Sequence, residues 1–220
     1  MPKASLVEAV YRKLLKEASI NVTGLAAVQT SDTGIKKEAV IYDIATLEEM
    51  LDQIFEGDEN IALGAVRGII RIRRPSNPCD GAWEVVLSAG PGIGKLVYGA
   101  AYAMSPSGKL IPDRMSVSVD AERGWKRAQG ERTSKELDFL YPPHKTPEKE
   151  DDCRRHNEPD REFLDRAYVA QGWETGMFKS LLNAHDEMVR RNGLSPGEEL
   201  SIFDTLKDHV IEFFHSSYPE

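Results

Sequence analysis

The sequence predicts an α+β fold that ends in a helical extension. Short apolar runs separated by turn residues indicate strands, and three well-marked caps indicate helices between and after them. After about residue 160, apolar residues recur at three- and four-residue intervals, which is the pattern of helices with one buried face. We therefore expect a core of residues 1–150 and a helical extension of residues 151–220 that follows a proline-rich acidic linker.

Two of the three caps lie in the first half of the chain. Ser5 with Glu8, and Thr46 with Glu49, have the spacing of a capping box, in which each side chain accepts a hydrogen bond from the other residue's amide. The turn-forming residues 31–34 separate two short apolar runs, which predicts a hairpin. The elements expected in this half are helix 5–18, strands 25–29 and 38–42, helix 46–55, and strands 64–73 and 83–88.

The third cap begins the last helix, where Pro196 takes the first helical position after Ser195. Between about residues 133 and 160, four prolines and the acidic run 148–152 favour an extended connection over a helix. The elements expected in this half are helix 94–104, strand 109–111, helix 121–128, helix 175–191 and the final helix from residue 196.

Composition and charge narrow the class of partner. The 28 basic and 36 acidic residues give a net charge of −8, and the pI is near 5.3. This acidic balance argues against a nucleic-acid partner, because phosphate backbones are bound by basic surfaces. No apolar run approaches the roughly 18 residues that a membrane span requires, so we do not expect a membrane partner either.

Cys79 and Cys153 are the two cysteines of the chain. We expect them to be free thiols in a reducing compartment, with a disulfide as the alternative. Cys153 and His156 have a spacing that occurs in zinc sites, but structural zinc needs four ligands and the sequence has no second pair. No metal site is therefore predicted.

The most informative stretch is AGPGIGK, residues 89–95, which joins a strand-like run to a helix-like run. A nucleoside triphosphatase loop, G-x-x-x-x-G-K-S/T, would need glycine in place of Ala89 and a hydroxyl in place of Leu96. A dinucleotide loop, G-x-G-x-x-G, would need glycine in place of Lys95. Both patterns fail at these positions. The glycines still allow backbone amides at a helix N-terminus to approach an anion such as pyrophosphate.

Residues 89–94 resemble the Q/R-x-x-G-x-G/A motif of the GNAT superfamily of N-acetyltransferases, with Ala89 in place of the leading Gln or Arg. The order of the expected elements is also similar to that of the superfamily. The resemblance implies a mixed, mostly antiparallel sheet flanked by helices, and a loop that binds the pyrophosphate of acetyl-CoA or CoA. The cofactor-binding residues that it implies are Leu87, Ala89, Gly90, Gly92, Ile93, Gly94 and Lys95.

Segments on both sides of the loop resemble a bacteriophage-encoded acetyltransferase-like family. They are PCDGAWEV at 78–85, KLVY at 95–98, IPDRMSVS at 111–118 and the acidic DDC at 151–153. The resemblance implies transfer of an acyl group from acyl-CoA to an unidentified amine in the host cytoplasm. The alternative is a non-catalytic virion or structural protein on the same fold, with phage structural proteins or further copies of itself as partners.

The superfamily resemblance also implies that the segment before helix 121–128 borders the pocket for the acyl acceptor. A simpler interpretation of this segment is a surface ion pair followed by a helix cap at Asp120. The substrate-binding residues that the resemblance implies are Asp113, Arg114, Ser116 and Ser118.

No catalytic residue is identified from the sequence. Glu84, before the loop, and Tyr141 are candidates for the base and the acid, and the sequence does not favour either. Tyr98, one turn into the helix after the loop, is expected to face the core. A basic stripe is expected either on a solvated sheet edge or against an anion, and it consists of Arg67, Arg71, Arg73 and Arg74.

Overall fold

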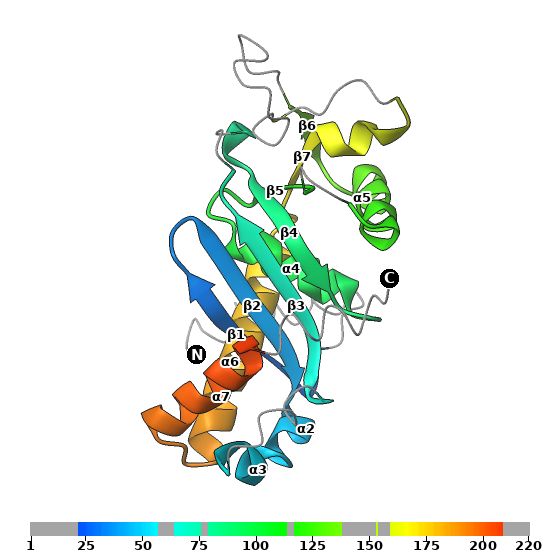
Figure 1. Ribbon diagram of the computed structural model, residues 1–220. Coiled ribbons are helices and arrows are strands. Elements are labelled where there is room, and N and C mark those ends of the chain that lie inside the picture. The colour runs from blue at the N-terminus through cyan, green and yellow to red at the C-terminus, as the bar shows by residue number, and fades with distance from the viewer. Residues whose placement is uncertain are drawn as a thin grey trace, which may run out of the picture.

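The computed structural model describes residues 22–56, 64–75, 79–113, 117–137, 153 and 159–208. Within these ranges one sheet has the strand order β1-β2-β3-β4-β5-β7-β6, and every neighbouring pair except β4–β5 is antiparallel (Figure 1). The predicted α+β class with a mostly antiparallel sheet is confirmed. The strands are β1 (Leu25–Asp32), β2 (Lys36–Asp43), β3 (Val66–Arg73), β4 (Trp83–Ala89), β5 (Lys109–Ile111), β6 (Ser134–Glu136) and β7 (Arg166–Val169).

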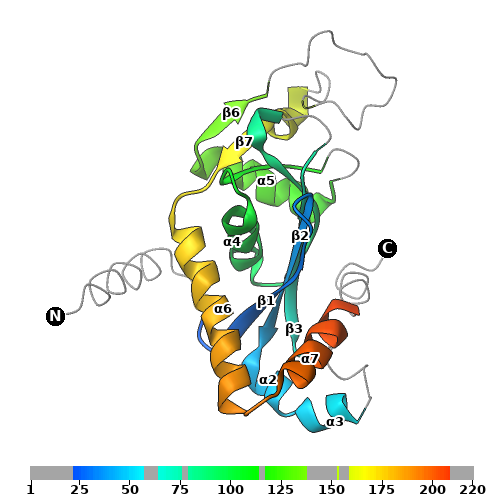
Figure 2. The same cartoon turned by 90° about the vertical axis from the view of Figure 1, so that its left-hand side faces the viewer.

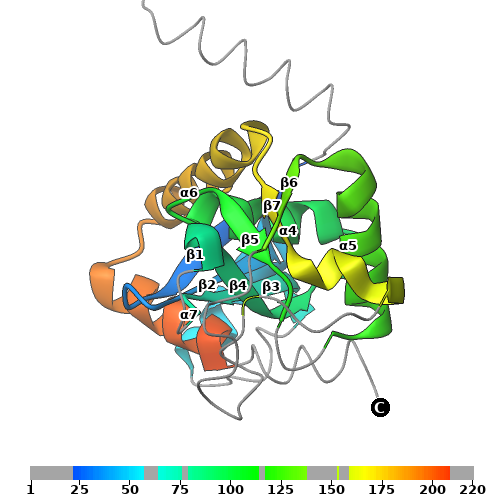
Figure 3. The same cartoon turned by 90° about the horizontal axis from the view of Figure 1, so that it is seen from above.

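Helices cover both faces of this sheet. On one face α4 lies between α5 and α6 (Figures 2 and 3). Val97 of α4 packs in a common core with Ile70 of β3 and Phe178 of α6. On the other face Val40 of β2 packs with Leu47 of α2 and with α3 and α7. The helices are α2 (Ile44–Glu48), α3 (Leu51–Phe55), α4 (Gly94–Met104), α5 (Val119–Glu131), α6 (Trp173–Arg191) and α7 (Pro196–Asp208).

The parallel pair β4–β5 opens the sheet beside the segment 89–95. The two strands are joined by α4, and they pair only through Trp83 with Leu110 and Glu84 with Ile111. The remaining five residues of β4 have no partner on the β5 side within the described ranges. A wedge therefore forms beside the carboxyl end of β4, which is where parallel β-α-β units bind ligands.

The hairpin and most helices lie where the sequence predicts them, but helix 46–55 is divided into α2 and α3. The cap is also different, because Asp43 Oδ1 accepts hydrogen bonds from both the amide and the hydroxyl of Thr46, each at 2.9 Å. Thr46 is therefore a donor in the first turn and not the cap. At Ser195 the predicted helix start is confirmed: α7 begins at Pro196, and the Ser195 amide donates to Glu198 Oε2 (2.7 Å).

Two strands, β6 and β7, were not predicted; β6 (Ser-Lys-Glu) has no apolar residue that would mark it as a strand. Strand β7 lies between β5 and β6, so residues beyond the predicted boundary at 150 contribute to the sheet. Ser118, and not Asp120, caps α5, because its hydroxyl accepts from the Ala121 amide (3.2 Å). The predicted helix 5–18 lies outside the described residues.

Candidate functional site

The segment between β4 and α4 makes a tight turn that ends at a helix N-terminus. The Ile93 amide donates to the Gly90 carbonyl (3.0 Å), and Ile93 caps α4 without a side-chain hydrogen bond. Gly92 has a φ of 77°, a conformation that glycine adopts readily. A Cβ built on Gly92 or Gly94 would meet no atom within 4 Å. Both residues therefore border open space.

Gly90 has a different role from the other two glycines of the loop. A Cβ on Gly90 would lie 2.5 Å from Val97 Cγ2, so close packing restricts this position to glycine. On the neighbouring strand, a Cβ on Gly68 would lie 2.8 Å from the same methyl group. The two glycines let α4 approach the sheet, which positions its first turn beside the end of β4.

The first turn of α4 is suited to an anion. The amides of Leu96 and Val97 donate to the Ile93 carbonyl at 2.8 and 3.1 Å, whereas those of Gly94 and Lys95 find no acceptor among the described residues. No acidic side chain occupies this turn. Unpaired amides and the helix dipole both attract negative charge, so the turn offers a site for a phosphate group.

A cavity of about 930 Å³ lies against this turn, within the size range of small-molecule sites. Its walls are the end of β4, one side of α4, α5 and the start of α6. Leu87 does not line it, because its side chain packs on the opposite face of the sheet. The predicted cofactor-binding residues that do line it are Ala89, Gly90, Gly92, Ile93, Gly94 and Lys95.

The cavity wall is more basic than the chain as a whole. The acidic residues on it are Asp120 and Glu131, and Asp120 is paired with Arg123 at 2.9 Å. Among the described residues of the wall, four basic minus two acidic residues give a balance of +2, against −8 for the chain. This local charge favours a polyanionic ligand. The basic residues of the wall are Lys95, Arg123, Arg127 and Arg132.

Aromatic rings form the inner wall of the cavity. The ring of Tyr98 packs edge-on against Trp125, with centroids 5.3 Å apart, and its hydroxyl lies 3.3 Å from Ser88 Oγ. Tyr98 was predicted to face the core; it is half-buried, packs against the core and also lines the cavity. The hydroxyls of Ser88 and Tyr98 and the carboxylates of Asp120 and Glu131 are groups on this wall that can carry a proton.

Arg132 marks the α6 end of the cavity. Its guanidinium lies 4.2 Å above the ring of Tyr102 and 6.0 Å from the ring of Trp173. Its Nη1 donates to Glu174 Oε1 at 2.6 Å. Burial raises the pKa of Tyr102, whose hydroxyl is fully buried and has no partner in the described part of the chain. This end of the cavity is thus a rigid arginine–aromatic stack.

Of the two predicted acceptor-binding residues that the structure describes, one lines the cavity and the other does not. Ser118 lines it, beside the first turn of α5 that it caps. Asp113 is half-buried and has a polar partner, but it does not line the cavity. Arg114 and Ser116 lie outside the described residues.

Glu84 does not face the cavity. Its neighbours Trp83 and Val85 point into the core beneath α4, so the Glu84 side chain lies on the other face of the sheet, where it pairs with Arg73 at 2.7 Å. Glu84, one of the two candidates for the base or the acid, is therefore not among the cavity groups that can carry a proton. Tyr141 lies outside the described residues.

The arginine stripe is not at an edge, because β3 lies between β2 and β4. Arg71 pairs with the buried Glu38 across β2 and β3, and Arg73 pairs with the buried Glu84 across β3 and β4. These two arginines thus neutralise carboxylates on the face of the sheet away from the cavity. Arg67 donates to the Gly64 carbonyl (3.2 Å), and Arg74 follows the strand.

Cys79 and Cys153 form a disulfide, which corrects the prediction of free thiols. Both are buried, in a small cluster with Ile111, Leu137 and Ala167. The fold brings two cysteines 74 residues apart in sequence to a Cα–Cα distance of 5.1 Å, which their separation along the chain does not reveal.

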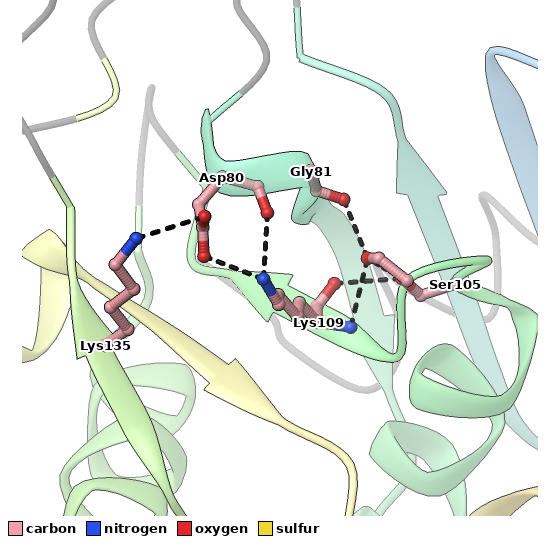
Figure 4. Close-up of polar contacts among 6 residues, drawn as sticks. Asp80, Gly81, Ser105, Lys109 and Lys135 are labelled. Carbon is pink, nitrogen blue, oxygen red and sulfur yellow. Dashed lines mark hydrogen bonds and ion pairs between the residues drawn. The ribbon is translucent and has the colours of Figure 1, made fainter.

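The turn that contains Cys79 has an unusual backbone, with positive φ at Cys79 (35°), Asp80 (57°) and Gly81 (75°). Figure 4 shows how side chains hold it. Lys109 Nζ donates to the Asp80 carboxylate (2.8 Å) and carbonyl (3.1 Å), and Lys135 Nζ lies 3.2 Å from the same carboxylate. This turn leads directly into β4 and so fixes the strand that carries the glycine loop.

No helix in the described ranges combines the length and apolar character that a membrane crossing needs. In the same ranges, no group of three or more His, Cys, Asp or Glu side chains could hold a metal ion. Comparison with protein-family models, curated proteins and solved structures finds no match for this chain.

Proposed function

We propose that the chain binds an acyl-CoA in this cavity and transfers the acyl group to an amine. The observation that carries the proposal is the position of the Gly94 and Lys95 amides, which have no acceptor among the described residues and lie at the mouth of a basic cavity with aromatic walls. CoA combines a pyrophosphate, a further phosphate and an adenine ring. The α4 turn and the arginines of α5 suit the phosphates.

In the proposed reaction the amine nitrogen attacks the thioester carbonyl carbon. The C–N bond forms, the C–S bond breaks, and the proton lost by nitrogen is balanced by the proton gained by the leaving thiolate. Ser88, Tyr98, Asp120 and Glu131 are the cavity groups available to relay that proton. The phosphate groups bound at α4 would position the thioester for this attack.

The first test is thermal unfolding of the full chain with and without acetyl-CoA. A ligand at about 100 times its Kd stabilises the folded state by about 2.7 kcal/mol, which is about 5 to 10 °C in Tm for a chain of this size. Gly94→Glu should abolish the shift, because the added carboxylate repels phosphate in a position that has open space. A glutamate in the first turn of a helix does not destabilise the helix itself.

Gly197→Glu is the matched control, since Gly197 also lies in the first turn of a helix, also borders open space and does not line the cavity. It should retain the full shift. An unshifted Tm of the wild type, or an equal shift in Gly94→Glu, would overturn the proposal. The alternative of a non-catalytic assembly protein would then be the better account.

A further inference from the structure

The α6 end of the cavity contains an arginine whose orientation is fixed by the protein. Arg132 is 12% exposed, and Glu174, which accepts from its Nη1, is completely buried. Glu174 also accepts from the Gln171 amide at 2.9 Å, so the carboxylate is itself held in place. With Tyr102 beneath it and the Val169 carbonyl 3.4 Å from Nη1, the guanidinium has little freedom to turn.

The other edge of the guanidinium is available to a ligand. Nη1 makes the two hydrogen bonds of Arg132, and Nε and Nη2 have no acceptor among the described residues. In the described part of the chain, the one fully buried side-chain polar atom without a partner is the Tyr102 hydroxyl. Nε and Nη2 of Arg132, which also have no partner there, are therefore not fully buried. Arg132 lines the cavity. Two adjacent N–H donors therefore remain accessible on a rigid support.

Nε and Nη2 form one of the planar edges with which arginine binds a carboxylate through two parallel hydrogen bonds. A phosphate of the cofactor could use the same donors, but the amides for phosphate lie at Gly94. Tyr102 is eight residues further along α4, which is about 12 Å at 1.5 Å per residue. This separation favours a second ligand group at the α6 end.

We infer that Arg132 binds the carboxylate of the acyl acceptor, so that the acceptor belongs to the amino-acid class and carries both an amine and a carboxylate. This inference rests on the proposed function, because it assigns the acceptor of the same reaction. The acceptor amine would then lie between Arg132 and the thioester, on the wall formed by Tyr98 and Trp125.

The experiment compares two sets of acceptors with acetyl-CoA and the full-length wild-type chain. One set is a pool of the common L-amino acids, and the other is the matching pool of their carboxamides. Release of free CoA thiol measures the transfer, and the Tm shift with acetyl-CoA alone measures cofactor binding. We expect the carboxylate pool to react at least about tenfold faster, as a charge-assisted hydrogen-bond pair requires.

Arg132→Lys keeps the positive charge beside the buried Glu174, so that no carboxylate is left unpaired, but it removes the planar edge. The variant should lose the preference for carboxylates and keep the acetyl-CoA shift. Arg71→Lys is the matched control, because Arg71 also pairs with a buried glutamate, Glu38, but lies on the face of the sheet away from the cavity. It should keep the preference. If Arg132→Lys does not fold, the comparison of the two pools on the wild type still tests whether the site prefers a carboxylate.

The outcomes separate the inference from the function on which it rests. An acetyl-CoA shift with equal rates for the two pools, or with no transfer to either, overturns the carboxylate site and leaves cofactor binding in place. Weakened acetyl-CoA binding in Arg132→Lys assigns the guanidinium to a cofactor phosphate and also overturns it. No acetyl-CoA shift in the wild type overturns both.

Discussion

Asp80 shows how one side chain can hold a backbone conformation that is otherwise unfavourable. The left-handed region is costly for residues with a Cβ, and Asp and Asn tolerate it better than most. Hydrogen bonding from Lys109 lowers the pKa of Asp80 below its usual value of 3.8, with burial acting in the opposite direction and Lys135 adding to the lowering. The ionised form of Asp80 is thus stabilised more in the folded chain than in the unfolded chain.

The expected pH dependence follows from the direction of this shift. A group whose pKa is lowered by folding stabilises the fold above its unfolded pKa, and the contribution disappears as pH falls through the lower, folded value. Asp80→Asn, which keeps the left-handed conformation accessible, should therefore reduce the free energy of unfolding by about 1 kcal/mol at pH 7. Denaturant unfolding of both proteins from pH 7 to pH 2 measures this.

The difference between the two proteins should shrink as the pH falls below about 4. Asp120→Asn is a suitable control, because Asp120 forms an exposed ion pair on α5 and does not support an unusual backbone. A wild-type advantage over Asp80→Asn that is constant across the pH range would contradict the assignment.

At the scale of elements, α4 and its glycines decide the position of the candidate site. The glycine loop was located from sequence because its chemistry depends on residue type at fixed spacing. The separate role of Gly90 could not be predicted, since the Val97 methyl that excludes a side chain there is known only once α4 lies on the sheet. Nor could the sequence show that Glu84 faces away, because the hydrophobic face of β4 is defined by its neighbours in space.

Other differences from the sequence-based expectations have the same origin. The sequence suggests that the arginines of β3 lie on a sheet edge. It does not reveal their partners, Glu38 and Glu84, because these belong to two other strands. The orientation of Arg132 could not be predicted from the sequence either, because it depends on residues of α4 and α6. Local signals such as the Ser195 cap and the hairpin could be predicted, whereas pairings between distant segments could not.

Gly90→Ala should destabilise the protein by about 1 to 3 kcal/mol, because its Cβ would lie 2.5 Å from Val97 Cγ2 in a well-packed region. Gly94→Ala, at a position with open space, should change the stability by less than about 1 kcal/mol. Chemical denaturation of both variants gives these values.

A double variant, Gly90→Ala with Val97→Ala, should show a favourable coupling, because the smaller neighbour removes the clash. Additive effects of the two substitutions would show that the Gly90 cost has another cause.

At the scale of the whole molecule, the Cys79–Cys153 disulfide connects the turn before β4 to a distant part of the chain. Its two cysteines are separated by 74 residues, and a crosslink of that span removes much of the conformational freedom of the unfolded state. The disulfide also belongs to the only described cluster that joins this turn to β5 and β7, through Ile111 and Ala167.

Replacing both cysteines by serine should lower the free energy of unfolding by about 4 kcal/mol, as the chain-entropy relation gives for a loop of this length. The wild type in a reducing agent should approach the variant, whereas the variant itself should not respond to the reductant. Thiol titration of the denatured, unreduced wild type should find no free thiol. Two free thiols per chain, or an unchanged stability of the double variant, would contradict this prediction.

The disulfide also closes a covalent ring that contains β4, the glycine loop, α4 and α5, and with them most of the cavity wall. Gln171 and Trp173 reach the cavity from outside that ring. A single backbone cut anywhere between residues 79 and 153 would therefore leave both fragments tethered. Such a nicked molecule would migrate as one chain until it was reduced, and the two parts of the cavity wall would remain together in the meantime.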